Sequence, residues 1–183
     1  MNVVVTGMGL STSIGQDVSA VWKNVICSSF VPGTNLQSNG FVQARDRSFH
    51  ALVEAFRDAG LWDGRALSGI DPARIGCTYS ASKPLFDGGV PRPPDDLQND
   101  LRIHFGLKGE ARNVIAACAT GAYSIALAAS WIEQGICDVV LAGSVEPRPH
   151  PLYEAGFRQM GVISREAVMR PFDARRSGFV FGE

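Results

Sequence analysis

The sequence lacks an excess of charge of either sign, since 17 Lys and Arg residues are balanced by 18 Asp and Glu residues. This balance gives no electrostatic basis for broad nucleic-acid binding or for adsorption to an anionic membrane, because both need a basic surface. An apolar run of about 18 residues or more, the length that spans a membrane, is also missing. The first residues have neither a basic flank nor a signal-type cleavage site, so we expect a strand at residues 3–6 rather than a targeting peptide.

Cysteine is scarce as well, and its spacing excludes the common metal-binding patterns. The four cysteines form no CxxC pair and have no zinc-type spacing. We therefore expect free thiols, no metal site and a reducing, cytoplasmic location. Cys77 and Cys137 lie within apolar, strand-like runs and Cys27 lies near a loop, whereas Cys118 is set apart by the segment that follows it.

The remaining composition is that of a folded α/β protein. Apolar residues make up 45% and charged residues 19% of the chain, which argues against extensive disorder. The 183 residues suit one domain, since domains usually have about 100–200. Strand-like and helix-like segments alternate, which predicts a sheet with helices on its faces. We expect strands at residues 3–6, 74–79, 113–117 and 138–143, helices at 16–25, 46–61, 97–105 and 119–134, and loops at 29–40 and 83–94.

The helix expected at residues 119–134 has an unusual composition. It carries no charged residue before Glu133 and is rich in alanine. A helix that is apolar on all sides is normally buried on all sides, so we expect protein both above and below it. With the strands on either side it forms a strand–helix–strand unit, and Cys118 occupies the first strand-to-helix junction.

That position makes Cys118 the candidate nucleophile. Unpaired N–H groups and the helix dipole favour a thiolate at the start of a helix, and the thiolate is the reactive form. Ala117, Ala119 and Gly121 leave room for a substrate carbonyl next to backbone N–H donors. On position alone, a buried structural cysteine is the alternative. The chain also has three histidines, none with the signature of a catalytic base: His50, His104 and His150.

Several segments, in order along the chain, resemble the β-ketoacyl-acyl-carrier-protein synthases, the condensing enzymes of the thiolase fold. Residues 116–122, Ala-Ala-Cys-Ala-Thr-Gly-Ala, are similar to the active-site segment of that family. Each further match is weak alone, but the ordered set around Cys118 is specific. The further matches are residues 4–9, 14–15, 45–47, 58–61, 103–109, 135–146 and 170–183, and the pair Gly156-Phe157 followed by Ser164.

The resemblance implies that residues 1–183 are the N-terminal βαβαβαββ half of a layered αβαβα architecture, with the C-terminal half absent. Cys118 would accept an acyl group from a carrier-protein thioester. The acyl-enzyme would then be attacked by the carbanion of a decarboxylating malonyl extender, in fatty-acid or polyketide biosynthesis. The backbone N–H of Cys118 would be one oxyanion donor, and Phe157 would line or gate the acyl pocket. Because the substrates travel on the phosphopantetheine of acyl carrier protein, neither a separate cofactor nor a metal is expected.

The catalytic histidines and lysine of the family belong to its second half, so the resemblance predicts that this chain alone is inactive. A second hypothesis is a non-catalytic thiolase-like subunit that pairs with a chain supplying the other half. A third, a cysteine hydrolase on another α/β fold, needs a histidine that the sequence does not supply. We also expect a homodimer through residues 113–117, and turn-holding roles for Glu146 and Asp173.

The sequence departs from the pattern of the family at three places. Residues 80–83, Ser-Ala-Ser-Lys, replace an expected glycine-rich turn, and Ser177 stands where the family commonly has Asp. The segments at 28–45 and 83–97 are shorter than usual. Since these loops help to shape the acyl channel and the dimer surface in the family, the acyl substrate stays open.

Overall fold

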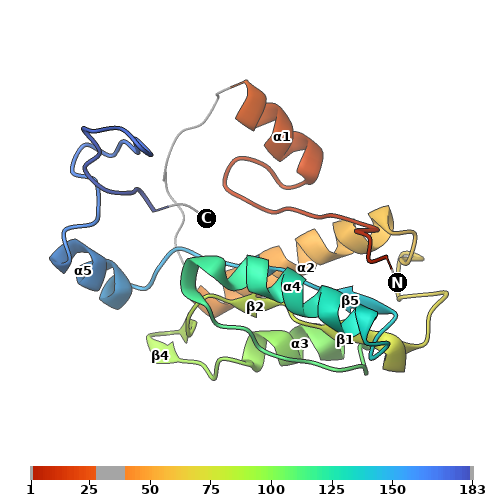
Figure 1. Ribbon diagram of the computed structural model, residues 1–183. Helices are drawn as coiled ribbons and strands as arrows, with labels where there is room; N and C mark the ends of the chain where they lie inside the picture. The colour runs from red at the N-terminus through yellow and green to blue at the C-terminus, as the bar shows by residue number, and fades with distance from the viewer. Residues whose placement is uncertain (1, 28–39, 182–183) are drawn as a thin grey trace.

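A parallel ladder of two extended segments forms the centre of the computed structural model, which describes residues 2–27 and 40–181 (Figure 1). Backbone bonds from Thr78 N–H to Leu141 O and from Ser80 N–H to Gly143 O join its two short strand pairs into one ladder. The strands expected at 74–79 and 138–143 are thereby confirmed. The pairs are β1 (Ile75–Cys77) with β5 (Val139–Leu141) and β2 (Ser80–Ala81) with β6 (Ser144–Val145).

A third extended segment lies on the other side of β1. Ala111 forms an isolated parallel bridge with Cys77, whose N–H donates to Glu110 O at 2.9 Å. The expected strand at 113–117 is wrong, because the structure has no strand at those residues. The amides of Val114 and Ala116 donate instead to side-chain hydroxyls, so they are not available to a neighbouring strand.

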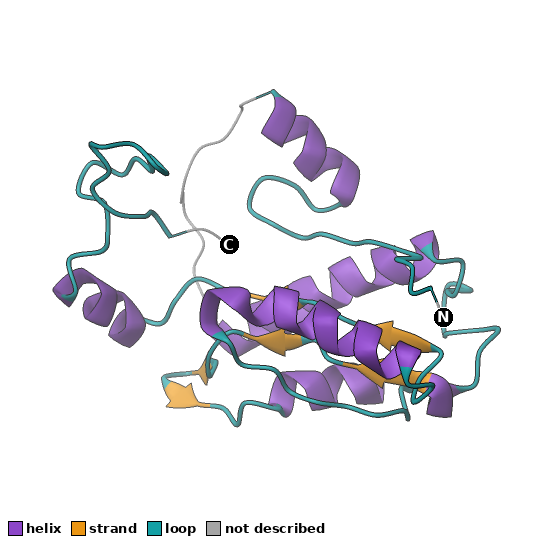
Figure 2. Cartoon of the chain, in the orientation of Figure 1, coloured by secondary structure: helices purple, strands orange, loops and turns teal. Residues whose placement is uncertain are grey.

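Helices cover both faces of this ladder, and the strand residues alternate accordingly. Ile75, Cys77 and Tyr79 belong to a large apolar core with α2 (Gly40–Asp58) and α3 (Asp96–Phe105). The intervening Gly76 and Thr78 face α4 (Thr120–Glu133), where Thr78 Oγ1 donates to Ser124 O at 2.9 Å. Figure 2 shows the α4 helix crossing in front of the strands. Large side chains thus pack toward one helix layer, and small or polar ones toward the other.

The helices begin and end where the sequence supplies the signals. The Asp17 carboxylate accepts from Ala20 N–H and starts α1 (Val18–Ile26). The α3 helix ends at Gly106, whose φ of 68° is readily adopted only by glycine. All four expected helices are confirmed, although α2 begins before the expected residue 46. None of the helices in the described ranges is long and apolar enough to cross a membrane.

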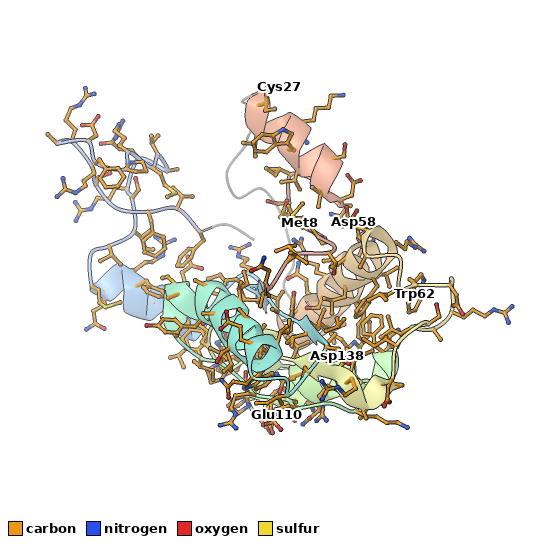
Figure 3. All side chains as sticks on the ribbon, turned by 45° about the vertical axis from the view of Figure 1, so that its right-hand side comes forward. Met8, Cys27, Asp58, Trp62, Glu110 and Asp138 are labelled. Carbon is orange, nitrogen blue, oxygen red and sulfur yellow. The ribbon has the colours of Figure 1, made fainter. Side chains whose placement is uncertain are left out.

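The N-terminal segment lies along α2 and does not join the sheet. The strand expected at 3–6 is wrong, and Val4 and Val5 are exposed. Side-chain carboxylates of α2 accept hydrogen bonds from amides just after residues 3–6. Met8 N–H donates to Asp58 Oδ2 at 3.0 Å, and Leu10 N–H donates to Glu54. Figure 3 shows Met8 beside Asp58.

Two elements were not expected from the sequence. Gly88 and Gly89, both with positive φ, form the two-residue turn of a hairpin within the loop at 83–94. The hairpin consists of β3 (Phe86–Asp87) and β4 (Val90–Pro91). Further on, α5 (Pro151–Gln159) starts with proline, which suits a first helical position. Apart from Gly40, the loop expected at 29–40 lies outside the described residues.

Candidate functional site

Cys118 lies on an exposed turn directly before the α4 helix. The turn is a single 3₁₀ element, Ala117–Ala119, and the 14-residue α4 begins at the next residue. The thiol is exposed and makes no disulfide. The expected location at the start of a helix is therefore confirmed, and the first backbone N–H groups of α4 are close along the chain, where a helix favours an anion.

The backbone just before the thiol is strained. Ala117 has a φ of 48°, in the left-handed region, which costs an L-residue about 1–2 kcal/mol. Thr120 spans this position with one hydroxyl, which accepts from Ala116 N–H at 3.0 Å and donates to Ala117 O at 2.8 Å. Thr120 is only 1% exposed. This role could not be read from a capping signal in the sequence, because Thr120 is the first residue of α4 and its hydroxyl bonds back to Ala116 and Ala117.

The first turns of α4 sit very close to the sheet. A Cβ added at Gly121 would lie 2.9 Å from Ser144 Oγ, so a larger residue would push the helix away from β6. One turn further on, the bond from Thr78 to Ser124 O fixes the same face of the helix. Together with the Thr120 bonds, these contacts hold the start of α4 and the turn that carries Cys118 in one position.

The opposite face of α4 is uncovered. A stripe of four residues faces the sheet and is buried: Thr120, Ser124, Ala128 and Trp131. On the outer side, Tyr123 is 61% and Ile125 57% exposed. The expectation of protein above and below the helix therefore holds on one side only within the described residues. An exposed apolar helix face of this kind usually marks an interaction surface.

Phe157, the other site residue expected from the sequence, lies in α5 within a group of three phenylalanine rings. Its ring centroid is 5.6 Å from that of Phe179 and 5.8 Å from that of Phe181, both in edge-on geometry. No hydrogen bond or ring contact among the described residues joins Phe157 to Cys118. The structure thus gives Phe157 an aromatic environment.

The histidines lie in other parts of the chain. His104 stacks on Phe49 with ring centroids 4.3 Å apart, and His150 stacks on Phe86 at 4.0 Å. His150 Nδ1 also accepts from Leu152 N–H at the start of α5, and His50 is exposed on α2. Within the described part of the chain, no hydrogen bond connects any of them to Cys118, so none is placed there as a base.

Of the two acidic residues expected to hold turns, Asp173 bonds within its own turn, whereas Glu146 joins the ends of two strands. Glu146 follows β6 and accepts hydrogen bonds from Ser82 and Lys83, which follow β2. Asp173 Oδ1 accepts from Arg175 N–H at 2.7 Å. This backbone bond, assisted by the Arg175 side chain, holds the pKa of Asp173 below its usual value. Among the described residues, neither carboxylate is bonded to the segment that carries Cys118.

The other cysteines differ from Cys118 in exposure or setting. Cys77 and Cys137 are buried, and burial raises the pKa of the Cys77 thiol to about 11. Cys77 is therefore neutral at physiological pH and fills the core. Cys27 is exposed but lies at the far end of α1 (Figure 3). Among the described residues, no group of three or more potential ligands could hold a metal ion.

A cavity of about 310 Å³ lies between the β3–β4 hairpin and the start of α5. Its walls include Pro84, Phe86, His150 and Tyr153, with the Lys83–Glu146 ion pair at its side. Burial raises the pKa of Tyr153, and its hydroxyl donates to Pro84 O at 3.3 Å. Cys118 does not line this cavity, so the exposed thiol and the cavity are separate features of the described chain.

Solved structures with the same arrangement define the class of fold. A β-ketoacyl synthase from Burkholderia phymatum STM815 superposes with a TM-score of 0.72 at 22% identity, covering 97% of this chain and 55% of that one. A type II polyketide synthase acyl carrier protein in complex with its ketosynthase matches with a TM-score of 0.66 at 20% identity, covering 90% and 56%. The expected thiolase-like fold of the ketosynthases is confirmed.

Sequence similarity then gives the family. The family model described as "Beta-ketoacyl synthase, N-terminal domain" matches residues 43–183. A 3-oxoacyl-[acyl-carrier-protein] synthase homolog of Saccharomyces cerevisiae is 44% identical over 248 aligned residues, which cover 99% of this chain and 56% of the yeast protein. The chain belongs to the β-ketoacyl synthase family, and it spans about half the length of the curated relatives it matches. Since the matched span exceeds the 183 residues present, the yeast protein also has segments within it that this chain lacks.

Proposed function

We propose that residues 1–183 form the N-terminal half of a β-ketoacyl synthase and that Cys118 carries the acyl group. The observation that supports this most is the position of Cys118, exposed on a tightly held turn at the start of α4, within a segment that resembles the active site of the family. Family membership supports the class of reaction.

In the first step, the Cys118 sulfur attacks the carbonyl carbon of an acyl thioester on a carrier protein. A new thioester forms on Cys118, and the phosphopantetheine thiol leaves with the proton. In the second step, a malonyl thioester loses CO₂, and the resulting carbanion attacks the acyl carbonyl. The carbon–sulfur bond to Cys118 breaks, and the product leaves as a β-ketoacyl thioester. The backbone N–H of Cys118 stabilises the oxyanion in both steps, and Phe157 lines the acyl pocket.

The partners in this proposal are an acyl carrier protein and the second half of the fold. The exposed outer face of α4, with Tyr123 and Ile125, supports a covering layer. The histidines that promote decarboxylation would come with that layer, since the three histidines of this chain have other contacts or lie exposed. One of the solved ketosynthases of this fold is bound to its acyl carrier protein, which supports the first partner.

The acyl-enzyme step is tested by labelling with a cysteine-directed acyl-pantetheine mimic, followed by peptide mapping. We expect the label on Cys118 and its loss in Cys118→Ala. Cys27→Ala is the matched control, because Cys27 is also exposed but lies at the end of α1. Unchanged labelling of Cys118→Ala would exclude Cys118 as the acyl carrier.

The half-enzyme assignment has its own test. The purified chain, supplied with acyl and malonyl thioesters of acyl carrier protein, is expected to form acyl-Cys118 without β-ketoacyl product. Adding a chain that carries the second half of a family member should restore condensation. Product formation by the purified chain alone would refute the division of labour between the two halves.

A non-catalytic thiolase-like subunit is the second candidate function. The observation in its favour is that no histidine of the described chain is bonded to Cys118 while the outer face of α4 is exposed. Such a subunit would bind a partner through α4 but would not need the thiol. An unlabelled Cys118, together with stable binding of a partner chain in both the wild type and Cys118→Ala, would favour this function over acyl transfer.

A further inference from the structure

Thr120 holds the backbone in front of Cys118 in a conformation that alanine rarely adopts. Its hydroxyl bonds to two consecutive residues, accepting from Ala116 N–H and donating to Ala117 O. Ala117 lies between these contacts with a φ of 48°. Few side chains can bridge both residues, because the group must be short and must donate and accept at once.

The same two bonds explain why the extended segment ends where it does. Ala116 N–H points to the Thr120 hydroxyl, so the strand-like course from Ala111 stops before the thiol. Ala119 N–H donates to Ala116 O at 3.0 Å and closes the 3₁₀ turn. Cys118 is the middle residue of this turn, so the position of its sulfur depends on the residues on both sides.

Thr120 is also anchored by the helix that it begins. It is buried at 1% exposure and opens the stripe of α4 that faces the sheet. The close approach of Gly121 to Ser144 leaves this end of the helix little room to move. Because the Thr120 hydroxyl is fixed by α4, it also fixes the turn that carries Cys118 relative to this helix.

We propose that Thr120 is a positioning residue for Cys118: its hydroxyl locks the Ala116–Ala117 backbone and so fixes the thiol at the start of α4. The hydroxyl does not touch the acyl substrate or take part in proton transfer. The inference deepens the proposed function, since it names the device that orients the same nucleophile, but its test does not need acyl transfer.

The test uses the full chain and measures the rate at which iodoacetamide alkylates each thiol, by peptide mapping across a range of pH. Thr120→Val keeps the shape but removes the hydroxyl, whereas Thr120→Ser keeps the hydroxyl. We expect alkylation of Cys118 to slow by about 10-fold in Thr120→Val, as one to two lost hydrogen bonds would give, with a changed pH profile. Thr120→Ser should stay near the wild type. Cys27 serves as the internal reference in every variant.

A rescue experiment separates positioning from a general loss of stability. Glycine adopts positive φ without strain, so Ala117→Gly added to Thr120→Val should recover part of the Cys118 rate. Equal Cys118 rates in the wild type and Thr120→Val would overturn the proposal. A rate in Thr120→Ser as low as in Thr120→Val would overturn it as well.

The wild-type chain supplies a measurement that holds even if Thr120→Val does not fold. The Ala116 amide should exchange slowly with D₂O, because it donates to a buried hydroxyl. Fast exchange at Ala116, with slow exchange at Leu141, would overturn the proposal. If Cys118 alkylation depends on Thr120 but the acyl mimic leaves Cys118 unlabelled, positioning stands and the proposed acyl transfer fails.

Discussion

The two faces of the central ladder contact their helices through different kinds of interaction. Toward α2 and α3, the strands present Ile75, Cys77 and Tyr79 to a core of large apolar side chains that is sealed within the chain. Toward α4 they present Gly76 and Thr78, and the contacts are hydrogen bonds and close backbone approaches. Burial of apolar area stabilises the first face, whereas hydrogen bonds and close packing stabilise the second.

The difference has a functional meaning. On the α4 face, a Cβ added at Gly76 or Gly121 would clash with its neighbours, so the helix has little room to shift. The candidate nucleophile is attached to the second face, at the end of α4 where Thr120 and Gly121 meet the sheet. One side of the strands thus contributes most of the stability of the chain, and the other side positions the Cys118 thiol.

Leu101 should give the largest effect, because the core on the α2–α3 face depends on its volume. It is fully buried in α3, so Leu101→Ala is expected to lower the free energy of unfolding by about 2–5 kcal/mol. Urea unfolding measures this change. Ile103→Ala on the same helix is the control, since Ile103 is 81% exposed and its loss should cost less than about 0.5 kcal/mol. Equal effects of the two variants would contradict the assignment of the core.

On the α4 face, the corresponding change is an added methyl group rather than a lost one. A Cβ at Gly76 would lie 2.7 Å from Cys137 Sγ and 3.1 Å from Glu110 O. Gly76→Ala should therefore cost about 1–3 kcal/mol through overpacking, and adding Cys137→Ala should restore part of it. Gly156→Ala is the matched control, because nothing lies within 4 Å of its Cβ position. A neutral Gly76→Ala would show that this face is not closely fitted.

Alkaline pH should lower the free energy of unfolding through two buried groups of the α2–α3 face. Burial raises the pKa of Cys77 from 9.0 to about 11 and that of Tyr79 from 10.0 to about 12. Between pH 9 and 10 the unfolded chain loses the Cys77 proton while the folded chain keeps it, so stability falls as the pH rises. The expected loss is about 1 kcal/mol between pH 9 and 10, measured by urea unfolding at each pH. Cys77→Ala should flatten this slope and Cys27→Ala should not; an unchanged slope in Cys77→Ala contradicts the prediction.

The smallest effect on stability is expected on the outer side of α4. Tyr123 and Ile125 are exposed, so the pair of changes Tyr123→Ser and Ile125→Ser should alter the free energy of unfolding by less than about 0.5 kcal/mol each. The two changes should nevertheless weaken self-association or the binding of a partner, which sedimentation velocity measures. A loss above about 1 kcal/mol would mean that the chain itself covers this side.

Local patterns allowed the helices and the central strands to be predicted. The apolar spacing of α1, α2 and α3 and the apolar run of β5 are each contained within a few residues. The α5 helix was missed, although Pro151 at its start and the Glu154–Arg158 pair one turn apart are signals of a helix.

The error at residues 113–117 has a physical cause, which is the choice of hydrogen-bond partner. The sequence there is strand-like, but hydroxyls of Ser80 and Thr120 take the amides of Val114 and Ala116. Just after residues 3–6, carboxylates of α2 take the amides of Met8 and Leu10 in the same way. The thiol was predictable from its segment, whereas the role of Thr120 needed the positive φ of Ala117.

The parallel pairing of β1 with β5 also governs when the protein can fold. The Arg74–Asp138 ion pair at the start of this ladder joins residues 64 positions apart. Contacts of such long range form late, after the local helices, and they slow folding. During synthesis, β1 has no β5 partner until residues 139–145 have emerged from the ribosome. Until then, the apolar side chains of Ile75, Cys77 and Tyr79 are only partly covered. A translational pause before β5 would therefore lengthen the period in which these apolar side chains are uncovered and prone to aggregation.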